Sequence, residues 1–95
     1  MLRLVWTLPA RADLREINSW LLEHRAPAIA LRTIISVRAR ALFIERFPHG
    51  GRPGADGVRV LRVHATPYLI LYRIQRDTVE VLRIRHERED WLVAR

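Results

Sequence analysis

The 95-residue sequence contains no cysteine and no lysine. Without cysteine the fold can hold neither a disulfide nor a thiolate metal site. The four histidines lie far apart without ligand-like spacing, so we expect no metal, and no motif indicates a cofactor. No apolar run approaches the roughly 20 residues that span a bilayer, and the run from Leu2 to Trp6 is too short for a signal peptide. We therefore expect a cytoplasmic protein without a membrane partner.

Basic residues, in contrast, are abundant and of one type. All 17 are arginine, against 10 acidic residues, which gives a formal net charge of +7. The planar guanidinium group matches carboxylates and phosphates, so the composition favours an acidic protein or a nucleic acid as partner. A GC-rich coding sequence also produces many arginines. The positions of the arginines therefore carry more information than their number.

Apolar periodicity divides the first half of the chain into a strand and two helices. Residues 1–6 are rich in β-formers and are expected to form a short strand. Thr7 is a suitable N-cap, and Pro9 fits the first turn of a helix that continues to about His24. A second helix is expected from about Pro27 to Arg46, because the residue before a proline avoids the helical region and ends the first helix.

Each expected helix has an apolar stripe. In the first helix the stripe comprises Leu14, Ile17, Trp20 and Leu21. In the second helix the main stripe comprises Ala30, Ile34, Val37, Ala41 and Ile44. This stripe is broadened by Leu31, Ile35 and Leu42. The second helix should therefore pack on both the first helix and the sheet.

The second half of the chain begins with a loop at residues 47–57, which holds all four glycines. Three strand-like runs follow at residues 58–63, 68–74 and 79–86, and their short connections predict an antiparallel meander. The order of strand, helix, helix and three-stranded meander predicts a single α+β domain over residues 1–95. A helical hairpin should cover one face of its sheet.

The middle strand of the meander is apolar on both faces. Alternation of side chains places Tyr68, Ile70 and Tyr72 on one face. It places Leu69 and Leu71 on the other. Because the helical hairpin can cover only one face, the other must be covered by the C-terminal tail, a second copy or a partner.

Six arginines lie in or just after the meander: Arg59, Arg62, Arg73, Arg83, Arg85 and Arg88. By alternation Arg83 and Arg85 share one face of the last strand, where two arginines can bind neighbouring phosphates or carboxylates. Arg59 and Arg62 should lie on opposite faces unless a bulge intervenes. The alternative is a solvated face with ordinary salt bridges to Glu80, Glu87 or Glu89.

His86 is the histidine best placed for acid–base chemistry, because it ends a strand beside arginines. Alternation groups it with Leu82 and Ile84 on the helix-facing side, which favours packing over catalysis. No carboxylate lies near it in sequence as a clear second catalytic group. In the C-terminal tail, Trp91 and Leu92 are expected to dock on the sheet, with Trp91 favoured as a packing residue over a stacking platform for a base.

Short motifs occur in order along nearly the whole chain. They are Trp6-Thr7 and Ala12-Asp13-Leu14 near the start, Pro48 and Gly50-Gly51-Arg52 in the loop, Gly57-Val58-Arg59-Val60-Leu61, Pro67-Tyr68 and Leu71-Tyr72-Arg73 in the meander, and His86-Glu87-Arg88-Glu89-Asp90 at the end. Together they resemble the ParE branch of the RelE/ParE superfamily of toxins from bacterial type II toxin–antitoxin modules. The resemblance implies the same order of elements as the periodicity.

The resemblance implies a target in one of two classes. RelE-like members cut mRNA on the ribosome with basic, histidine or tyrosine groups on the sheet, whereas ParE-like members lack that set and poison DNA gyrase. His86 and Arg62 fall where some ribonuclease members keep functional residues. This chain has no carboxylate partner for His86 in sequence and no tyrosine near its C-terminus. Gyrase poisoning without catalysis is favoured, a ribonuclease is the alternative, and a plain nucleic-acid-binding module is a third hypothesis.

The resemblance also implies a partner, a small acidic antitoxin that binds the toxin in a hetero-oligomer. The residues expected to contact the antitoxin are Tyr68, Leu69, Leu71, Tyr72 and Arg73. The residues expected to contact the target are Arg59, Arg62, Arg83, Arg85, Arg88 and Trp91.

Overall fold

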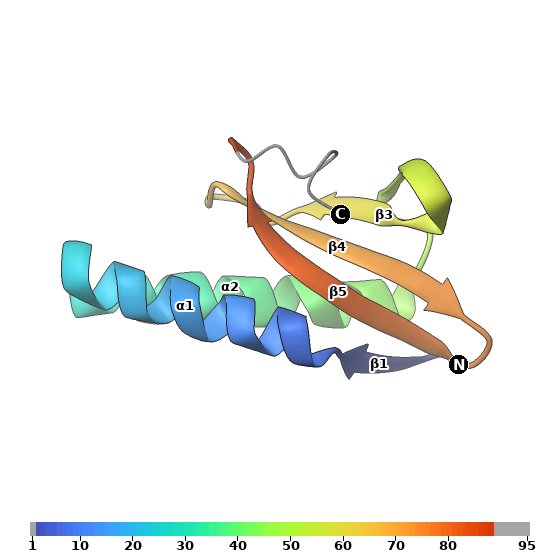
Figure 1. Ribbon diagram of the computed structural model, residues 1–95, viewed down its shortest axis with the longest axis horizontal. Helices are drawn as coiled ribbons and strands as arrows, with labels where there is room; N and C mark the ends of the chain where they lie inside the picture. The colour runs from blue at the N-terminus through green and yellow to red at the C-terminus, as the bar shows by residue number, and fades with distance from the viewer. Residues whose placement is uncertain (1, 89–95) are drawn as a thin grey trace.

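The computed structural model describes residues 2–88 and contains two helices packed against one face of a five-stranded sheet (Figure 1). The elements in chain order are β1 (Arg3–Trp6), α1 (Leu8–His24), α2 (Pro27–Arg46), β2 (Arg52–Pro53), the short 3-10 turn η1 (Ala55–Gly57), β3 (Arg59–Arg62), β4 (Tyr68–Gln75) and β5 (Thr78–His86). The strands lie in the order β1-β5-β4-β3-β2. The α+β prediction is confirmed.

One strand lies where the sequence predicted only loop. Arg52 and Pro53 pair antiparallel with Val60 and Arg59 and form β2 at the edge of the sheet. Proline has no N–H to donate, so it is tolerated at an edge strand but not in the centre of a sheet. At the other edge, β1 runs parallel to β5, with Trp6 opposite Val81.

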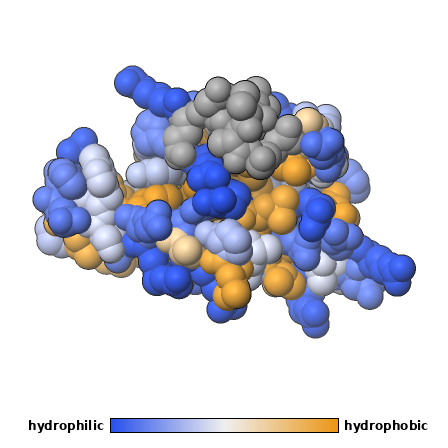
Figure 2. All heavy atoms as spheres, viewed as in Figure 1, coloured by the Kyte–Doolittle hydropathy of each residue, from blue (hydrophilic) through white to orange (hydrophobic). Residues whose placement is uncertain are grey.

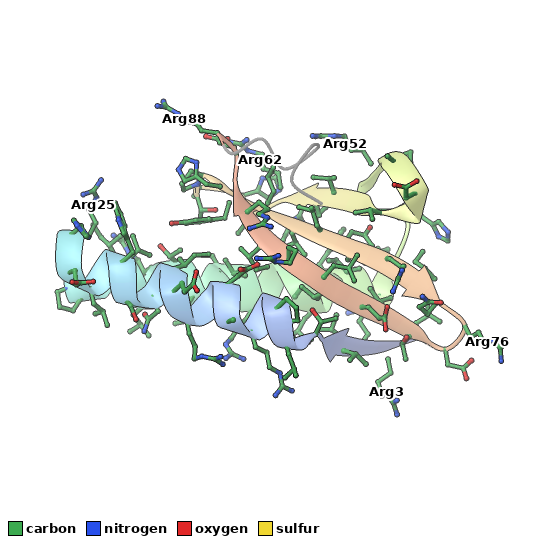
Figure 3. The ribbon with its side chains drawn as sticks, viewed as in Figure 1. Arg3, Arg25, Arg52, Arg62, Arg76 and Arg88 are labelled. Carbon is green, nitrogen blue, oxygen red and sulfur yellow. The ribbon has the colours of Figure 1, made fainter. Side chains whose placement is uncertain are left out.

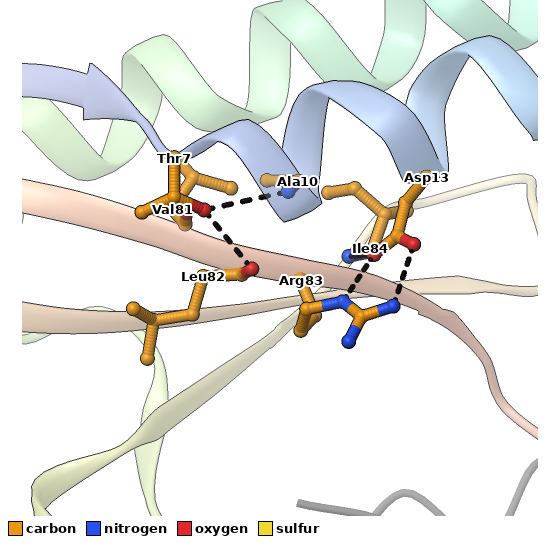
Figure 4. Close-up of polar contacts among 7 residues, drawn as sticks. All are labelled: Thr7, Ala10, Asp13, Val81, Leu82, Arg83 and Ile84. Atoms are coloured by element: carbon orange, nitrogen blue, oxygen red, sulfur yellow. Dashed lines mark hydrogen bonds and ion pairs between the residues drawn. The ribbon is translucent and has the colours of Figure 1, made fainter.

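Thr7 fixes the start of α1 against β5 (Figure 4). Its hydroxyl oxygen accepts a hydrogen bond from the backbone N–H of Ala10 at 3.3 Å, as an N-cap does. The same hydroxyl donates to the carbonyl of Val81 at 2.8 Å, and the backbone N–H of Thr7 donates to that carbonyl at 3.1 Å. The predicted cap therefore also joins the first helix to the sheet.

A bulge in β5 reverses the side-chain alternation along that strand. Tyr72 pairs with Val81 but Leu71 pairs with Arg83, so Leu82 is an extra residue opposite β4. Without this extra residue, Val81 and Ile84 would point to opposite faces, because side chains alternate with a period of two. With it, both are buried in the core that packs against the helices.

The buried apolar stripe of α2 is narrower than the sequence predicted. Leu31, Ile35 and Leu42 are 62%, 56% and 57% exposed, so the expectation that they widen the buried stripe is wrong. Each residue turns an α-helix by about 100°, so Leu31 and Leu42, which follow the buried Ala30 and Ala41, lie on its flank. The same correction applies to Trp20 of α1, which is 47% exposed.

Both faces of β4 are buried, as its alternation predicted. Tyr68, Ile70 and Tyr72 belong to the core between the sheet and the helices. Leu69 and Leu71 belong to a second, smaller cluster on the opposite side, together with Val60 and the partly buried Val58.

The hydroxyl of Tyr72 attaches the glycine loop to the core. It accepts from the backbone N–H of Gly51 at 2.8 Å and donates to the carbonyl of Pro48 at 2.8 Å. A Cβ atom at position 51 would lie 2.6 Å from this hydroxyl, so only glycine fits there without a shift. The loop that leads into β2 therefore has a fixed position beside β3.

The carboxylate of Asp13 closes the edge of β5 beyond the end of β1 (Figure 4). Its Oδ2 accepts from Arg83 Nε at 2.7 Å and from the backbone N–H of Ile84 at 3.0 Å, and its Oδ1 accepts from Arg83 Nη2 at 2.8 Å. Asp13 is only 7% exposed. The sequence placed Asp13 in a motif but did not indicate this contact, which joins residues 70 positions apart.

Replacing Asp13 with alanine should lower the free energy of unfolding by about 3 kcal/mol, because it leaves a half-buried guanidinium group and a strand N–H without their acceptor. Urea denaturation measures this change. The matched control is Glu80→Ala, which breaks the Arg73–Glu80 pair, whose side chains are 44% and 27% exposed. That pair should contribute no more than about 1 kcal/mol. Equal losses in the two variants would show that Asp13 is an ordinary surface partner.

Candidate functional site

The side of the sheet away from the helices carries arginines around an apolar strip. We call this side the distal face and define it by Val60, Arg62, Leu69, Leu71, Arg83 and Arg85. In the register of the sheet, Leu69 lies between Arg62 on β3 and Arg85 on β5. Directly opposite residues on neighbouring strands point to the same face, so these three form one row across the sheet.

A second row lies beside the first. Leu71 stands between Val60 on β3 and Arg83 on β5. The side chain of Arg83 leaves this row, since it turns around the free edge of β5 to reach Asp13. Of the predicted target-binding arginines, the register therefore places Arg62 and Arg85 in one row of the distal face, and Arg83 is held at its edge. The side chain of Arg85 also lines a cavity beside α1.

Arg62 forms an exposed salt bridge across the end of β4. Its Nη1 lies 2.7 Å from Oε1 of Glu87, in the turn that follows β5, and the two side chains are 55% and 36% exposed. Glu87 and Glu80 are two of the salt-bridge partners that the sequence offered, and Glu80 pairs with Arg73. Exposed pairs of this kind contribute little stability, so a bound phosphate or carboxylate can take the place of Glu87 beside Arg62.

Two other predicted arginines have different positions. Arg59 lies on the helix-facing side, as its spacing from Arg62 predicted, and binds the glycine loop through the carbonyls of Gly51 at 3.1 Å and His49 at 3.4 Å. Arg88 follows β5. Figure 3 shows the side chain of Arg88 on the same side of the molecule as Arg62.

Arg52 is a residue that the charge argument did not include. It is exposed on β2, and its side chain lies on the same side of the molecule as those of Arg62 and Arg88 (Figure 3). Arg3 and Arg76 lie at the other end of the sheet, near the β4–β5 turn (Figure 3). The motif Gly50-Gly51-Arg52 was the one signal in the sequence that pointed to Arg52.

His86 lies on the helix-facing side with Ile84, as alternation predicted. Its ring stands edge-on to that of Tyr68, with centroids 5.6 Å apart. Its Nδ1 accepts a hydrogen bond from the backbone N–H of Arg88 at 3.1 Å, which places the proton of the neutral ring on Nε2. The register of the sheet therefore places His86 and the row of Arg62, Leu69 and Arg85 on different faces, and the side chain of Arg85 also reaches the cavity that His86 lines.

A cavity of about 380 Å³ beside His86 contains a carboxylate that the sequence did not bring near it. The cavity lies between α1 and the start of β4 and end of β5, and Glu16, Trp20, Tyr68 and Arg85 are among the residues that line it. Glu16 is 70 positions away in sequence, so spacing along the chain could not reveal the pair.

Most of the residues expected to contact the antitoxin are not at the surface. Tyr68 and Tyr72 are 8% and 0% exposed and face the helices, which corrects the view of them as surface groups. Leu69 and Leu71 are buried on the distal face, and Arg73 is exposed. The predictions for Trp91 and Leu92 lie outside the described residues.

The helical hairpin contains a groove that the sequence analysis missed. It has a volume of about 620 Å³ and an apolar lining of Trp6, Leu14, Leu31 and Ile34. Its polar lining residues within the described chain are Arg11, Arg15, Asn18 and Arg38, with no carboxylate among them. Figure 2 shows hydrophobic side chains reaching the surface among hydrophilic ones on the side where α1 and β1 lie.

Two classes of site are not found within residues 2–88. No group of three or more histidine, cysteine, aspartate or glutamate side chains is arranged to hold a metal ion there. Neither described helix combines the length and hydropathy needed to cross a membrane.

Comparison with known proteins gives one consistent family. Residues 4–91 match the family model of the ParE toxin of the type II toxin–antitoxin system parDE. Protein Y4kP of Sinorhizobium fredii is 36% identical over 90 residues, covering 94% of this chain and 92% of that protein. Toxin RelE3 of Caulobacter vibrioides is 38% identical over 82 residues, covering 84% and 88%.

Comparison with solved structures agrees. A chain of the chromosomal ParDE toxin–antitoxin system from P. aeruginosa has a TM-score of 0.83 at 27% identity, covering 90% of this chain and 96% of that chain. Sequence motifs, fold and relatives all agree, and the chain belongs to the ParE toxin family of type II toxin–antitoxin systems, within the RelE/ParE superfamily.

Proposed function

We propose that this toxin inhibits growth by binding and poisoning DNA gyrase, without catalysing a reaction itself, and that an acidic antitoxin neutralises it. The observation that carries the proposal is the composition of the distal face. Its row places the anion-binding groups of Arg62 and Arg85 on either side of the buried Leu69. Such a surface is suited to tight binding of an anionic partner.

The chemistry of arginine supports an inhibitor over an enzyme. A guanidinium group stays protonated at any physiological pH, so Arg62 and Arg85 are poor general bases. The ionisable groups best suited to proton transfer, His86 and Tyr68, lie on the helix-facing side of the sheet, whereas Arg62 lies on the distal face. A non-catalytic poison needs affinity and shape alone, which the distal face can supply.

A specific observation keeps a ribonuclease as the second candidate. His86 and Glu16 line the same cavity together with Arg85 and Tyr68. A histidine and a carboxylate are groups from which an acid–base pair for RNA cleavage can be built. The third hypothesis, a plain nucleic-acid-binding module, has no observation that favours it over these two.

The charge of the chain supports an acidic antitoxin as the neutralising partner. A net charge of +7 on 95 residues steers acidic chains towards it and strengthens their association at low ionic strength. The similar P. aeruginosa structure is described as part of a ParDE toxin–antitoxin system. A hetero-oligomer of toxin and antitoxin in the cytoplasm follows from this proposal.

Induction of the toxin in growing bacteria distinguishes the two targets. We expect incorporation of labelled thymidine to fall before that of labelled methionine, together with a DNA-damage response, because gyrase is needed for replication. The measurement is pulse labelling at intervals after induction. If methionine incorporation falls first and mRNA is cleaved, the ribonuclease is the correct assignment.

Substitution of the arginine row should reduce toxicity. Arg62→Ala combined with Arg85→Ala removes two charge-assisted contacts, and we expect at least about a hundredfold more toxin to be needed for the same growth arrest. Growth under titrated induction, normalised to folded toxin, is the measurement. The control is Arg76→Ala at the other end of the sheet, which should keep full toxicity. Full toxicity of the double variant would remove the distal face from target binding.

His86 gives a separate test of catalysis. For a gyrase poison, His86→Ala should lower toxicity only in proportion to the folded protein that is lost, since the ring packs against Tyr68. For a ribonuclease, the loss should be on the order of a hundredfold or more at unchanged fold. Circular dichroism melting and titrated induction give the two quantities, and Glu16→Gln should reproduce a catalytic defect but not a packing one.

A further inference from the structure

The cavity of about 380 Å³ between α1, the start of β4 and the end of β5 has no part in the proposed binding of gyrase. Its volume is at the small end of the range for ligand-binding pockets, about 300–1,000 Å³, which suits one small molecule or one nucleotide. The residues of α1 that line it are Asp13, Glu16, Ile17 and Trp20. At about 100° per residue they lie on the side of α1 opposite the groove between the helices.

Aromatic rings form part of the cavity wall. The indole of Trp20 is 47% exposed, and the ring of His24 stacks on it with centroids 4.4 Å apart, which fixes the plane of the indole. Tyr68 and His86 line the cavity from the sheet and stand edge-on to each other. Rigid aromatic walls of this kind bind flat rings, and nucleobases are bound in this way by many proteins.

The polar groups of the cavity include an acceptor and donors. The carboxylate of Asp13 is already bound by Arg83. No salt bridge among residues 2–88 includes Glu16, whose carboxylate is exposed beside the cavity. Arg85 contributes a guanidinium group, and the neutral ring of His86 carries its proton on Nε2. A ligand for this cavity therefore needs donors for one carboxylate and acceptors for neighbouring N–H groups.

We propose that this cavity binds a guanine base, from a free nucleotide or from a single strand. Guanine presents two adjacent donors, its N1–H and its N2 amine, to the two oxygens of the Glu16 carboxylate. Its O6 and N7 atoms are acceptors that match Arg85, a pairing that arginine commonly makes with guanine. The flat ring packs against Trp20.

The carboxylate of Glu16 gives the physical reason for guanine over the other bases. Adenine and cytosine place the lone pair of a ring nitrogen where guanine has an N–H, so that lone pair would face the carboxylate. Uracil has one N–H between two carbonyl groups and brings an oxygen towards the carboxylate. A mismatch of this kind leaves a polar group without its partner and lowers affinity strongly.

Titration calorimetry with the full toxin chain and three mononucleotides tests the inference. We expect GMP to bind most tightly, and IMP, which lacks only the N2 amine, to bind about tenfold more weakly. AMP should bind more weakly than GMP by at least about tenfold. Equal dissociation constants for all three would show that the basic chain attracts only the phosphate, and would overturn the inference.

Substitution of Glu16 distinguishes base recognition from charge. Glu16→Gln removes a negative charge, which strengthens the general attraction of phosphates, yet it should raise the dissociation constant of GMP at least about tenfold and leave that of AMP no weaker. Trp20→Leu keeps an apolar side chain without the ring and should weaken both nucleotides about tenfold. Circular dichroism melting confirms that each variant is folded.

The matched control is Glu23→Gln, which makes the same change at another exposed carboxylate of α1, one that does not line this cavity within the described chain. Its dissociation constant for GMP should stay within about threefold of the parent. An equal loss in Glu16→Gln and Glu23→Gln, or unchanged GMP binding in Glu16→Gln, would overturn the assignment to Glu16.

Short single strands identify the source of the guanine. A strand of adenosines with one internal guanosine is compared with the same strand made of adenosines alone. Preference for the first strand shows that the cavity accepts guanine within a chain, whereas equal binding of both, with GMP preferred over AMP, assigns it to a free nucleotide. No preference in either comparison overturns the inference. Because binding is the measurement, the result does not depend on whether gyrase or mRNA is the target.

Discussion

The contact between Asp13 and the edge of β5 joins the two layers of this toxin. The strand β1 pairs with β5 only as far as Trp6 and Val81, because the chain then turns into α1. Beyond that point the edge of β5 needs an acceptor for its N–H groups, and the carboxylate of Asp13 supplies one to Ile84. The same carboxylate holds Arg83. Asp13 thus connects α1 to β5 at Arg83, the residue at the edge of the distal face.

The bulge at Leu82 and the contact of Asp13 act on the same two residues. The bulge turns Ile84 into the core and leaves Arg83 and Arg85 on the distal side. Asp13 then withdraws the Arg83 side chain to the edge, so that Arg85 is the β5 arginine that faces Arg62 across Leu69. The arginines of one strand therefore have two different roles, one in holding the fold and one at the surface.

The toxin has two separate surfaces that differ in whether their apolar residues are buried or exposed. On the distal face the apolar residues Leu69 and Leu71 are buried and the arginines stand around them. On α2 the apolar residues are themselves exposed and Arg38 stands among them. The same chain therefore presents two chemically different surfaces, one on each side of the sheet.

Periodicity, capping and turn residues determined the elements of this fold, because these signals are local. Both helices, the meander and the cap at Thr7 follow from the sequence, and so does the family resemblance. Only the tertiary structure decided which apolar residues are buried: the width of the α2 stripe depends on how closely α1 and the sheet approach it. The partner of Arg83 was decided in the same way, since Asp13 comes from the far end of the chain and meets Arg83 only after folding. The cavity that Glu16 and His86 both line likewise exists only in the folded chain, because the two residues lie 70 positions apart.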